Sequence, residues 1–363
     1  MFTASSPFNN WPLLFKYDSC PAAASHHLQR NEPTMLRSLS FVCSLTFLSL
    51  ELVTPSYADS PQQPPHDAPK HVRILTIGNS FTHNATRYLN QIVEAAGHKL
   101  THKMLSIGGS PLELHAKKAL AYETDTTAEL ARYKNGDILQ EALQSERWDF
   151  VTIQQLSIKS HDIETYRPYA QQLADIIRRD APQAKLLVHQ TWAYRSDDPR
   201  FSRTKPAIGE PATPQAMYEG LSQAYRTIVD ELSANRIPVG DAFWAADNHP
   251  KYGYRAPADF DAKSLKYPEL PDQTHSLHVG YRWRESDGKK QLKMDGHHAN
   301  SAGEYLGACV WFECLYGESP IGNEFVPDKL APEYATHLQT IAHQAAQQSG
   351  DVIHGIANSP STP

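Results

Sequence analysis

The sequence has few cysteines, no long apolar run and no excess of positive charge. No apolar run reaches the roughly 18 residues of a membrane-spanning helix, so stable membrane insertion is not expected. Lys and Arg number 34 against 40 Asp and Glu, and a net charge of −6 provides no general attraction for nucleic acid. Apolar residues make up 40% of the chain, which predicts a soluble globular α/β enzyme with a sizeable core.

The N-terminal stretch has the features of an export signal. Arg37 precedes an apolar stretch over 39–50, and residues 56–58 form a small-x-small cleavage pattern. We expect a signal peptide at 35–58 and an over-extended N-terminus at 1–34, with a natural disordered extension as the alternative. The protein would then be exported, to the periplasm or outside the cell.

The remaining chain is expected to hold one domain. Residues 59–70 are rich in Pro and Gln and predict a flexible linker, the domain follows at 71–350, and 351–363 form a loose tail. Cys309 and Cys314 are five positions apart in a predicted helix, about 140° apart around its axis, so no disulfide is expected between them.

Short apolar runs alternate with longer segments of helical periodicity throughout the domain. This alternation predicts crossover units and a three-layer α/β/α, flavodoxin-like sandwich around a parallel sheet of about five strands. Residues 244–294 interrupt the pattern and predict a functional loop or lid. The expected strands are 72–77, 100–107, 148–153, 185–189 and 237–239. The expected helices are 84–96, 111–133, 138–143, 166–179, 214–234, 301–315 and 332–348.

Ligands bind beyond the carboxyl ends of the strands in such sheets, so we expect the functional residues there. Ser80 follows the first strand at the start of a helix, where it could be a nucleophile or simply a helix cap. Gly109 follows the second strand. It could let the backbone come close to a ligand and donate an N–H to it, or it could simply form a tight turn. After the third strand, either Gln154 or Gln155 could donate an amide to an oxyanion.

The strongest local signal is Asp295-x-x-His298, just before a predicted helix. This spacing lets the carboxylate accept an imidazole N–H while the other ring nitrogen faces a serine. A metal site formed by Asp295, His297 and His298 is the alternative, with His275-x-x-His278 as a further ligand pair. We favour the triad and expect neither a metal nor a cofactor.

Together these blocks resemble the SGNH/GDSL hydrolase superfamily. More narrowly, the GNSF block, the segment from Gly108 to His115 and the segment from Thr191 to Tyr194 are similar to a bacterial branch known mainly as a domain of unknown function. The resemblance runs from about residue 71 to residue 316 and is weakest over 244–294.

The resemblance implies Ser80 as nucleophile, His298 as general base and Asp295 as the residue that orients it. The Ser80 and Gly109 N–H groups and the Gln154 side chain would form the oxyanion hole. The chain departs from the family in having Asn79 where GDSL enzymes have Asp, and Gln154 where most members have Asn.

The implied activity is hydrolysis of an ester, such as an O-acetyl group on a carbohydrate, with a small molecule or a glycan as substrate. Trp192 and Tyr194 follow the fourth strand and could bind a sugar ring at the rim of the crevice, or could simply pack there. A larger aromatic platform could include Trp244, Tyr252, Tyr254, Tyr281 and Trp283. A non-catalytic glycan-binding protein on the same fold is the alternative function.

Overall fold

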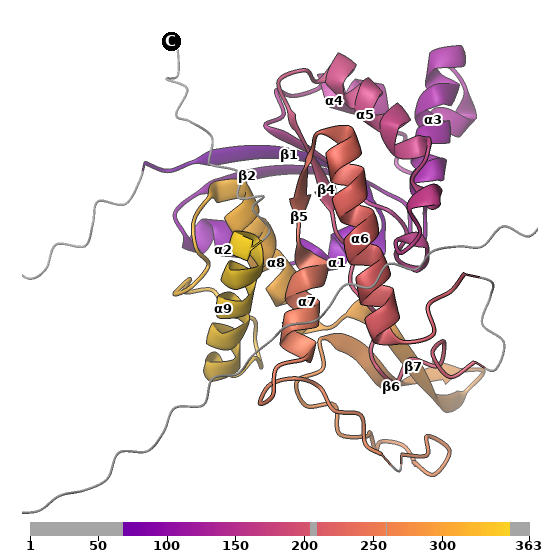
Figure 1. The fold of residues 1–363 in the computed structure, drawn as a ribbon, viewed down its shortest axis with the longest axis vertical. Coiled ribbons are helices and arrows are strands. Elements are labelled where there is room, and N and C mark those ends of the chain that lie inside the picture. Colours follow the sequence, from indigo (N-terminus) through magenta and orange to yellow (C-terminus); the bar gives the residue numbers. More distant parts are fainter. Residues whose placement is uncertain (1–67, 204–208, 259, 349–363) are drawn as a thin grey trace, which may run out of the picture. The chain divides into compact units, whose positions relative to one another are not determined.

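The computed structural model describes residues 68–203, 209–258 and 260–348 (Figure 1). The predictions for the signal peptide, most of the linker and the tail at 351–363 lie outside these residues. The described residues all belong to one compact unit. Among them, no helix combines the length and the apolar character needed to cross a membrane.

A five-stranded sheet with strand order β2-β1-β3-β4-β5 lies at the centre of this unit, and all its strand pairs are parallel. The predicted fold class is therefore confirmed, and the five predicted strands lie within about two residues of the observed ones. Their bounds are β1 His71–Gly78, β2 Lys99–Ser106, β3 Phe150–Ile153, β4 Lys185–His189 and β5 Asn235–Ile237.

Two groups of helices cover the sheet. Helices α3, α4, α5 and α6 contact their neighbours in one layer, and α2, α7 and α9 gather around α8 in the other (Figure 1). The helices are α1 Ser80–Ala85, α2 Leu89–Ala95, α3 Leu112–Thr124, α4 Leu139–Gln144, α5 Tyr169–Asp180, α6 Pro214–Leu232, α7 Val239–Asp247, α8 Ser301–Tyr316 and α9 Pro332–Gln348.

The core lies between the sheet and these layers. β1 contributes Leu75 and Ile77, which are fully buried, and α8 is apolar almost all round, as expected of a helix enclosed by its neighbours. Each such Leu or Ile stabilises the fold by about 1.5–3 kcal/mol. Cys309 and Cys314 are buried on α8 and are not joined by a disulfide, as the helical spacing predicted.

The predicted helix 84–96 is wrong in its start and its continuity. Helix α1 already begins at Ser80, and the chain leaves the helical path between α1 and α2. The Thr86 hydroxyl donates to the Thr82 carbonyl at 2.8 Å, a bond that competes with the regular ladder and bends helices.

The segment 244–294 is more regular than a loop. After α7 ends, an antiparallel hairpin forms from β6 (His278–Ser286) and β7 (Lys289–Ala299). Its two-residue turn, Asp287-Gly288, has φ of 52° and 68°, the left-handed conformation of a type I′ turn. An Asp-Gly pair between alternating side chains is a strong hairpin signal that the sequence reading missed.

The strand register brings the carboxyl ends of the central strands together. Gly78 of β1 lies opposite Ser106 of β2, and Ile77 lies opposite Ile153 of β3. The chain leaves β1 and β3 toward opposite layers, which makes their shared edge the topological switch point where such folds bind ligands. Ser80 follows β1 directly at this edge.

Candidate active site

The turn after β1 fixes the position of Ser80. Asn79 caps α1, because its Oδ1 accepts the Phe81 N–H at 3.0 Å, while its Nδ2 donates to the Ser110 carbonyl at 2.9 Å. Asn79 therefore takes the capping role that was the alternative for Ser80. Gly78 has to be a glycine, since an added Cβ would lie 2.3 Å from Thr82 Oγ1.

The three residues predicted as a triad lie together in hydrogen-bonding order. Ser80 Oγ lies 3.0 Å from His298 Nε2, although 218 positions separate the two residues. His298 Nδ1 lies 3.1 and 3.2 Å from the two Asp295 carboxylate oxygens, and the His298 backbone N–H also donates to Asp295. The arrangement links a hydroxyl, an imidazole and a carboxylate in series.

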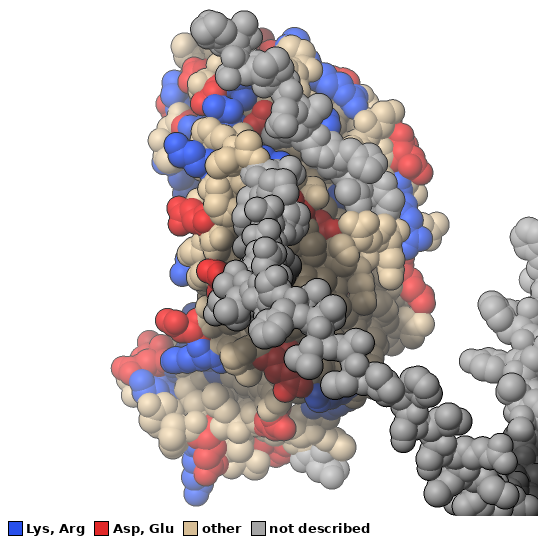
Figure 2. All heavy atoms as spheres, turned by 90° about the vertical axis from the view of Figure 1, so that its left-hand side faces the viewer, with Lys and Arg blue, Asp and Glu red and all other residues tan. Residues whose placement is uncertain are grey.

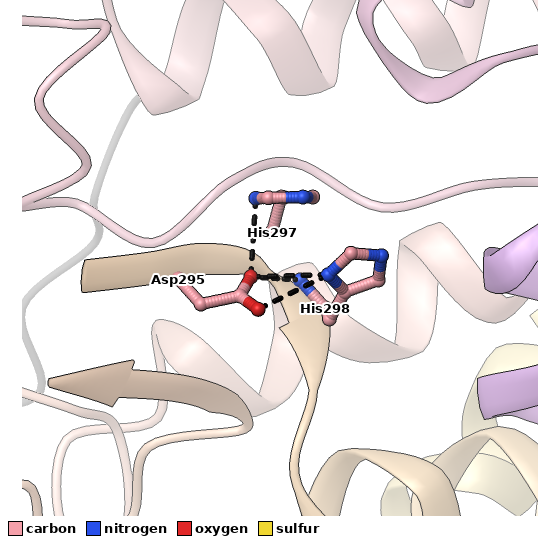
Figure 3. Close-up of side chains that lie close together, drawn as sticks. All are labelled: Asp295, His297 and His298. Carbon is pink, nitrogen blue, oxygen red and sulfur yellow. Dashed lines mark hydrogen bonds and ion pairs between the residues drawn. The ribbon is translucent and has the colours of Figure 1, made fainter. Parts of the chain in front are cut away.

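Asp295 is the centre of a larger charged group. Its carboxylate accepts from Arg282 Nη2 at 2.9 Å, and His297 Nδ1 approaches it at 3.1 Å (Figure 3). Burial raises the pKa of Asp295, but the hydrogen bonds from His298 and the adjacent imidazoles outweigh it and lower the pKa below its usual range. Asp295 is therefore ionised at neutral pH.

His297 is partly buried beside His298 and Asp295. Burial, together with the positive charge that His298 can carry, lowers the pKa of His297 to about 4. His297 is therefore neutral at pH 7 and adds no positive charge next to His298. Figure 3 shows both imidazole rings reaching the same carboxylate.

Contacts from other elements hold the end of β7 over α1. The Ala299 N–H donates to Asn84 Oδ1 at 3.3 Å, and Asn84 Nδ2 donates to Glu304 Oε1 at 3.0 Å. Trp192 Nε1 donates to the His297 carbonyl at 2.9 Å. These bonds tie the His298 segment to α1, α8 and the loop after β4.

The glycine turn after β2 is fixed beside the Ser80 turn. Gly109 is exposed and has φ of 69°, a conformation that favours glycine. The next residue, Ser110, is held by Asn79 and by His115, whose Nε2 lies 2.8 Å from Ser110 Oγ. The His115 Nδ1 atom is in turn 2.7 Å from the Tyr133 hydroxyl, so this histidine braces the turn.

Gln154 does not present a free amide to the site. It is fully buried, and its Nε2 donates to Asn79 Oδ1 at 3.0 Å and to the Gln155 carbonyl at 2.6 Å. Gln155 is no substitute, because its Nε2 donates to the Thr165 carbonyl at 2.7 Å. The Gln154 amide, which stands where most members of the superfamily have Asn, thus supports the capping residue Asn79. Because its Nε2 group is already bonded to two acceptors, Gln154 does not offer the oxyanion donor that was predicted.

Trp192 and Tyr194 do not form the predicted rim. Trp192 is fully buried, with ring centroids 4.3 Å from Phe81 and 4.4 Å from Phe243. Tyr194 is only 4% exposed, and its hydroxyl lies 2.9 Å from Ser157 Oγ. Packing, which was the alternative for both residues, therefore describes them.

The wider aromatic platform is also wrong, because its members separate into different places. Trp244 and Tyr254 line a cavity of about 470 Å³ that Tyr194 also borders. Tyr252 packs against α9 through Tyr334, with ring centroids 5.7 Å apart. Tyr281 and Trp283 lie on the hairpin.

Truncation of Trp192 is expected to destabilise the fold. Because the indole is enclosed by Phe81 and Phe243, Trp192→Ala should lower the free energy of unfolding by about 3–5 kcal/mol. Urea denaturation followed by circular dichroism measures the change. Leu130→Ala, at a side chain that is 54% exposed, should cost less than about 1 kcal/mol. Equal stability of the Trp192 variant and the wild type would contradict this assignment.

A metal ion is the other group that these residues could hold. Asp295, His297 and His298 offer ligand atoms that all lie within 4.8 Å of one another. The Arg282 guanidinium already bonds to Asp295, however, and its positive charge opposes a cation at the same carboxylate. His278, from the pair considered as further ligands, is buried and bonds to the Ala193 carbonyl, so it does not complete the cluster.

The sequence reading missed the residues that hold the triad in place. Arg282 could have been found from the Asp-Gly turn, because the hairpin register that it sets places Gly280 opposite Asp295 and Arg282 two residues further along β6. Asn84 and the buried Gln154–Asn79 pair carry no comparable local signal, because their partners are distant in sequence.

The fold and the site define an α/β protein with a Ser-His-Asp arrangement at the carboxyl edge of a parallel sheet. Residues 73–208 match the family described as Domain of unknown function (DUF4886), which confirms the predicted branch over this part of the chain. No curated protein matches the chain.

Solved structures are similar to the chain over most of its length. A DUF4886 family protein from Bacteroides uniformis shares 23% identity, with 76% of this chain and 95% of that chain covered and a TM-score of 0.57, and so has the same fold. A protein from Slackia heliotrinireducens, provisionally named an SGNH hydrolase, shares 22% identity over 67% of this chain and 98% of that one, with a TM-score of 0.41.

Proposed function

We propose that this protein is a serine esterase of the SGNH type. The observation that carries the proposal is the hydrogen bond between Ser80 Oγ and His298 Nε2, at 3.0 Å, on an imidazole that Asp295 holds from the other side. A serine, an imidazole and an ionised carboxylate in this order are what nucleophilic acyl transfer requires.

In the proposed reaction, Ser80 Oγ attacks the ester carbonyl while His298 Nε2 takes the hydroxyl proton. The tetrahedral oxyanion is stabilised by the Ser80 N–H at the start of α1 and by the Gly109 N–H. When the intermediate collapses, His298 returns the proton to the departing alcohol. A water molecule, deprotonated by the same imidazole, then attacks the acyl carbon, and the bond from that carbon to Ser80 Oγ breaks as His298 gives the proton to Oγ, which releases the acid and restores Ser80.

The charges around the site suit this sequence of proton transfers. His298 becomes positive during each attack, and the Asp295 carboxylate stabilises that charge. His297 is next to His298 but neutral at pH 7, since its pKa is lowered to about 4. A second positive imidazole at this position would oppose proton transfer to His298.

The substrate we propose is an ester of a carbohydrate, for example an O-acetyl group, encountered outside the cytoplasm if the protein is exported. The cavity that Trp244 and Tyr254 line supports a carbohydrate ligand, because aromatic faces beside polar groups bind sugar rings, and it is separate from the triad, none of whose residues line it. The same cavity motivates the alternative of a glycan-binding protein without activity.

Labelling by a fluorophosphonate probe separates the enzyme from the binding protein. An activated serine attacks this phosphorus electrophile, so the expected result is one adduct, located at Ser80 by mass spectrometry. The adduct should be absent from Ser80→Ala and present in Ser145→Ala, a variant at an exposed helix end. Wild-type protein without an adduct would favour the binding protein.

The metal-dependent alternative makes the opposite prediction under chelation. Activity toward 4-nitrophenyl acetate should be unchanged after exhaustive dialysis against EDTA, because the proposed proton transfers use side chains alone. Loss of activity that Zn²⁺ restores would instead favour a metal centre at Asp295, His297 and His298.

A further inference from the structure

One face of the β6–β7 hairpin carries a row of cationic side chains that begins at the triad. Residues two apart on a strand, and residues paired across an antiparallel ladder, share a face. Arg282 pairs with Lys293, while Arg284 is two residues beyond Arg282 and Lys289 is four before Lys293. Asp295 shares this face, and its bond to Arg282 joins the row to the active site. We call Arg282, Arg284, Lys289 and Lys293 the basic strip.

The opposite face of the hairpin is occupied. Trp283 Nε1 donates to the Glu269 carbonyl at 2.7 Å, and Tyr281 packs edge-on against Phe260 with centroids 4.9 Å apart. Lys290 on that face is paired with Glu285 at 2.7 Å. Because the loop before β6 covers this side, the basic strip is the face that a ligand can reach.

The outer cations of the strip have no counter-charge among the residues that the structure describes. Arg284, Lys289 and Lys293 are exposed, and their side chains make no ion pair or hydrogen bond within 68–203, 209–258 and 260–348. The protein as a whole has a net charge of −6, and basic and acidic side chains are interspersed on the face in Figure 2. The one-sided row of cations, of which Arg282 alone is paired among the described residues, is therefore a local feature.

We propose that the basic strip binds an acidic polysaccharide and guides an ester on that chain to Ser80, an inference that rests on the proposed esterase. From Asp295 to Lys289 the strand extends about 20 Å, a length that several sugar units span. Carboxylates along the polymer would meet the cations successively, while one acylated unit lies over Ser80. Charge complementarity of this kind raises both affinity and the rate of encounter.

The chemistry of the site favours an acidic polysaccharide over other polyanions. The proposed reaction needs a carboxylic ester, and sugar hydroxyls carry such esters, whereas the backbone of a nucleic acid is built from phosphodiesters. A flat anionic membrane would require a broad basic face with apolar anchors, and the strip is a single row on a narrow hairpin.

The test compares two acetylated polymers of matched acetyl content: acetylated polygalacturonate, which is anionic, and acetylated xylan without acidic side groups. The measured quantity is the ratio of kcat/KM for the anionic polymer to that for the neutral one. The strip variant is Arg284→Gln/Lys289→Gln/Lys293→Gln, which leaves Arg282 and its bond to Asp295 intact. The matched control, Lys117→Gln/Lys134→Gln/Lys185→Gln, removes three exposed lysines far from the hairpin in sequence.

The strip variant should lower this ratio about tenfold, and the control variant should leave it unchanged. Raising the salt concentration should reduce the wild-type ratio in the same direction, since salt screens exposed charges. Equal ratios in the wild type and the strip variant would overturn the inference.

Binding of polygalacturonate without acetyl groups keeps the inference separate from the proposed activity. The Ser80→Ala protein should be retarded in gels that contain this polymer. A protein that carries Ser80→Ala together with the three substitutions of the strip variant should not be retarded. If the wild type were inactive on 4-nitrophenyl acetate, the proposed esterase activity would be contradicted, but binding to the polymer could still be measured. If the protein were retarded equally in gels that contain single-stranded DNA of matched charge, selectivity for the polysaccharide would be overturned.

Discussion

Replacement of Ser80 by alanine is expected to reduce kcat for 4-nitrophenyl acetate by about 10⁴-fold or more. The variant loses the only atom that forms the acyl-enzyme in the proposed mechanism, and the remaining oxyanion donors give only weak residual catalysis. Because Asn79, not Ser80, caps α1, the fold should tolerate the change. Steady-state kinetics on purified protein, with thermal unfolding as a check, measures both effects.

Ser145→Ala provides the comparison for Ser80→Ala. Ser145 is an exposed serine that bonds only its own helix, through the Ala142 carbonyl. Its replacement should leave kcat within about a factor of two, since surface changes of this kind have small effects. Wild-type turnover by the Ser80 variant would disprove the assigned nucleophile.

Asp295→Asn is expected to reduce kcat by about 10³–10⁴-fold while leaving the protein folded. The carboxylate can only accept hydrogen bonds, so it requires a proton on His298 Nδ1 and leaves Nε2 free to take the Ser80 proton. An asparagine amide can donate to Nδ1 instead, which moves the imidazole proton to Nε2. The base is then blocked at the atom that faces Ser80.

The size of this effect also depends on the charge of Asp295. Because the pKa of Asp295 is lowered, its carboxylate stays ionised as the pH falls from 7 to 5, and its influence on His298 is constant in this range. Asp287→Asn, in the hairpin turn, changes the same atoms without contacting His298 and should leave kcat unchanged. An Asp295→Asn variant with near-wild-type kcat would show that His298 needs no orienting carboxylate.

The sequence was most informative where the architecture itself placed the residues. Alternating strands and helices implied a parallel sheet, whose strand ends must meet at one edge. The Asp295-x-x-His298 spacing then gave an imidazole and its partner in one local motif. The resemblance to the SGNH/GDSL superfamily paired this imidazole with Ser80, and their atoms lie 3.0 Å apart.

Features that depend on distant packing could not be predicted in this way. Whether Trp192 faces solvent is decided by Phe81 and Phe243, which lie more than 50 positions away on either side. The place after β3 left Gln154 and Gln155 open and the resemblance favoured Gln154, yet the direction of its amide is set by the Asn79 side chain. The hairpin is a different case, because its Asp-Gly turn was visible and was passed over in favour of a loop.

The base and its orienting acid both lie on β7, a strand of the hairpin and not of the central sheet. They therefore belong to one short ribbon, while the nucleophile belongs to the sheet scaffold. A change in the pose of that ribbon alters the distance from imidazole to hydroxyl without disturbing the imidazole–carboxylate pair. The reacting groups are thus divided between two modules, and the fit of one module onto the other sets the working geometry.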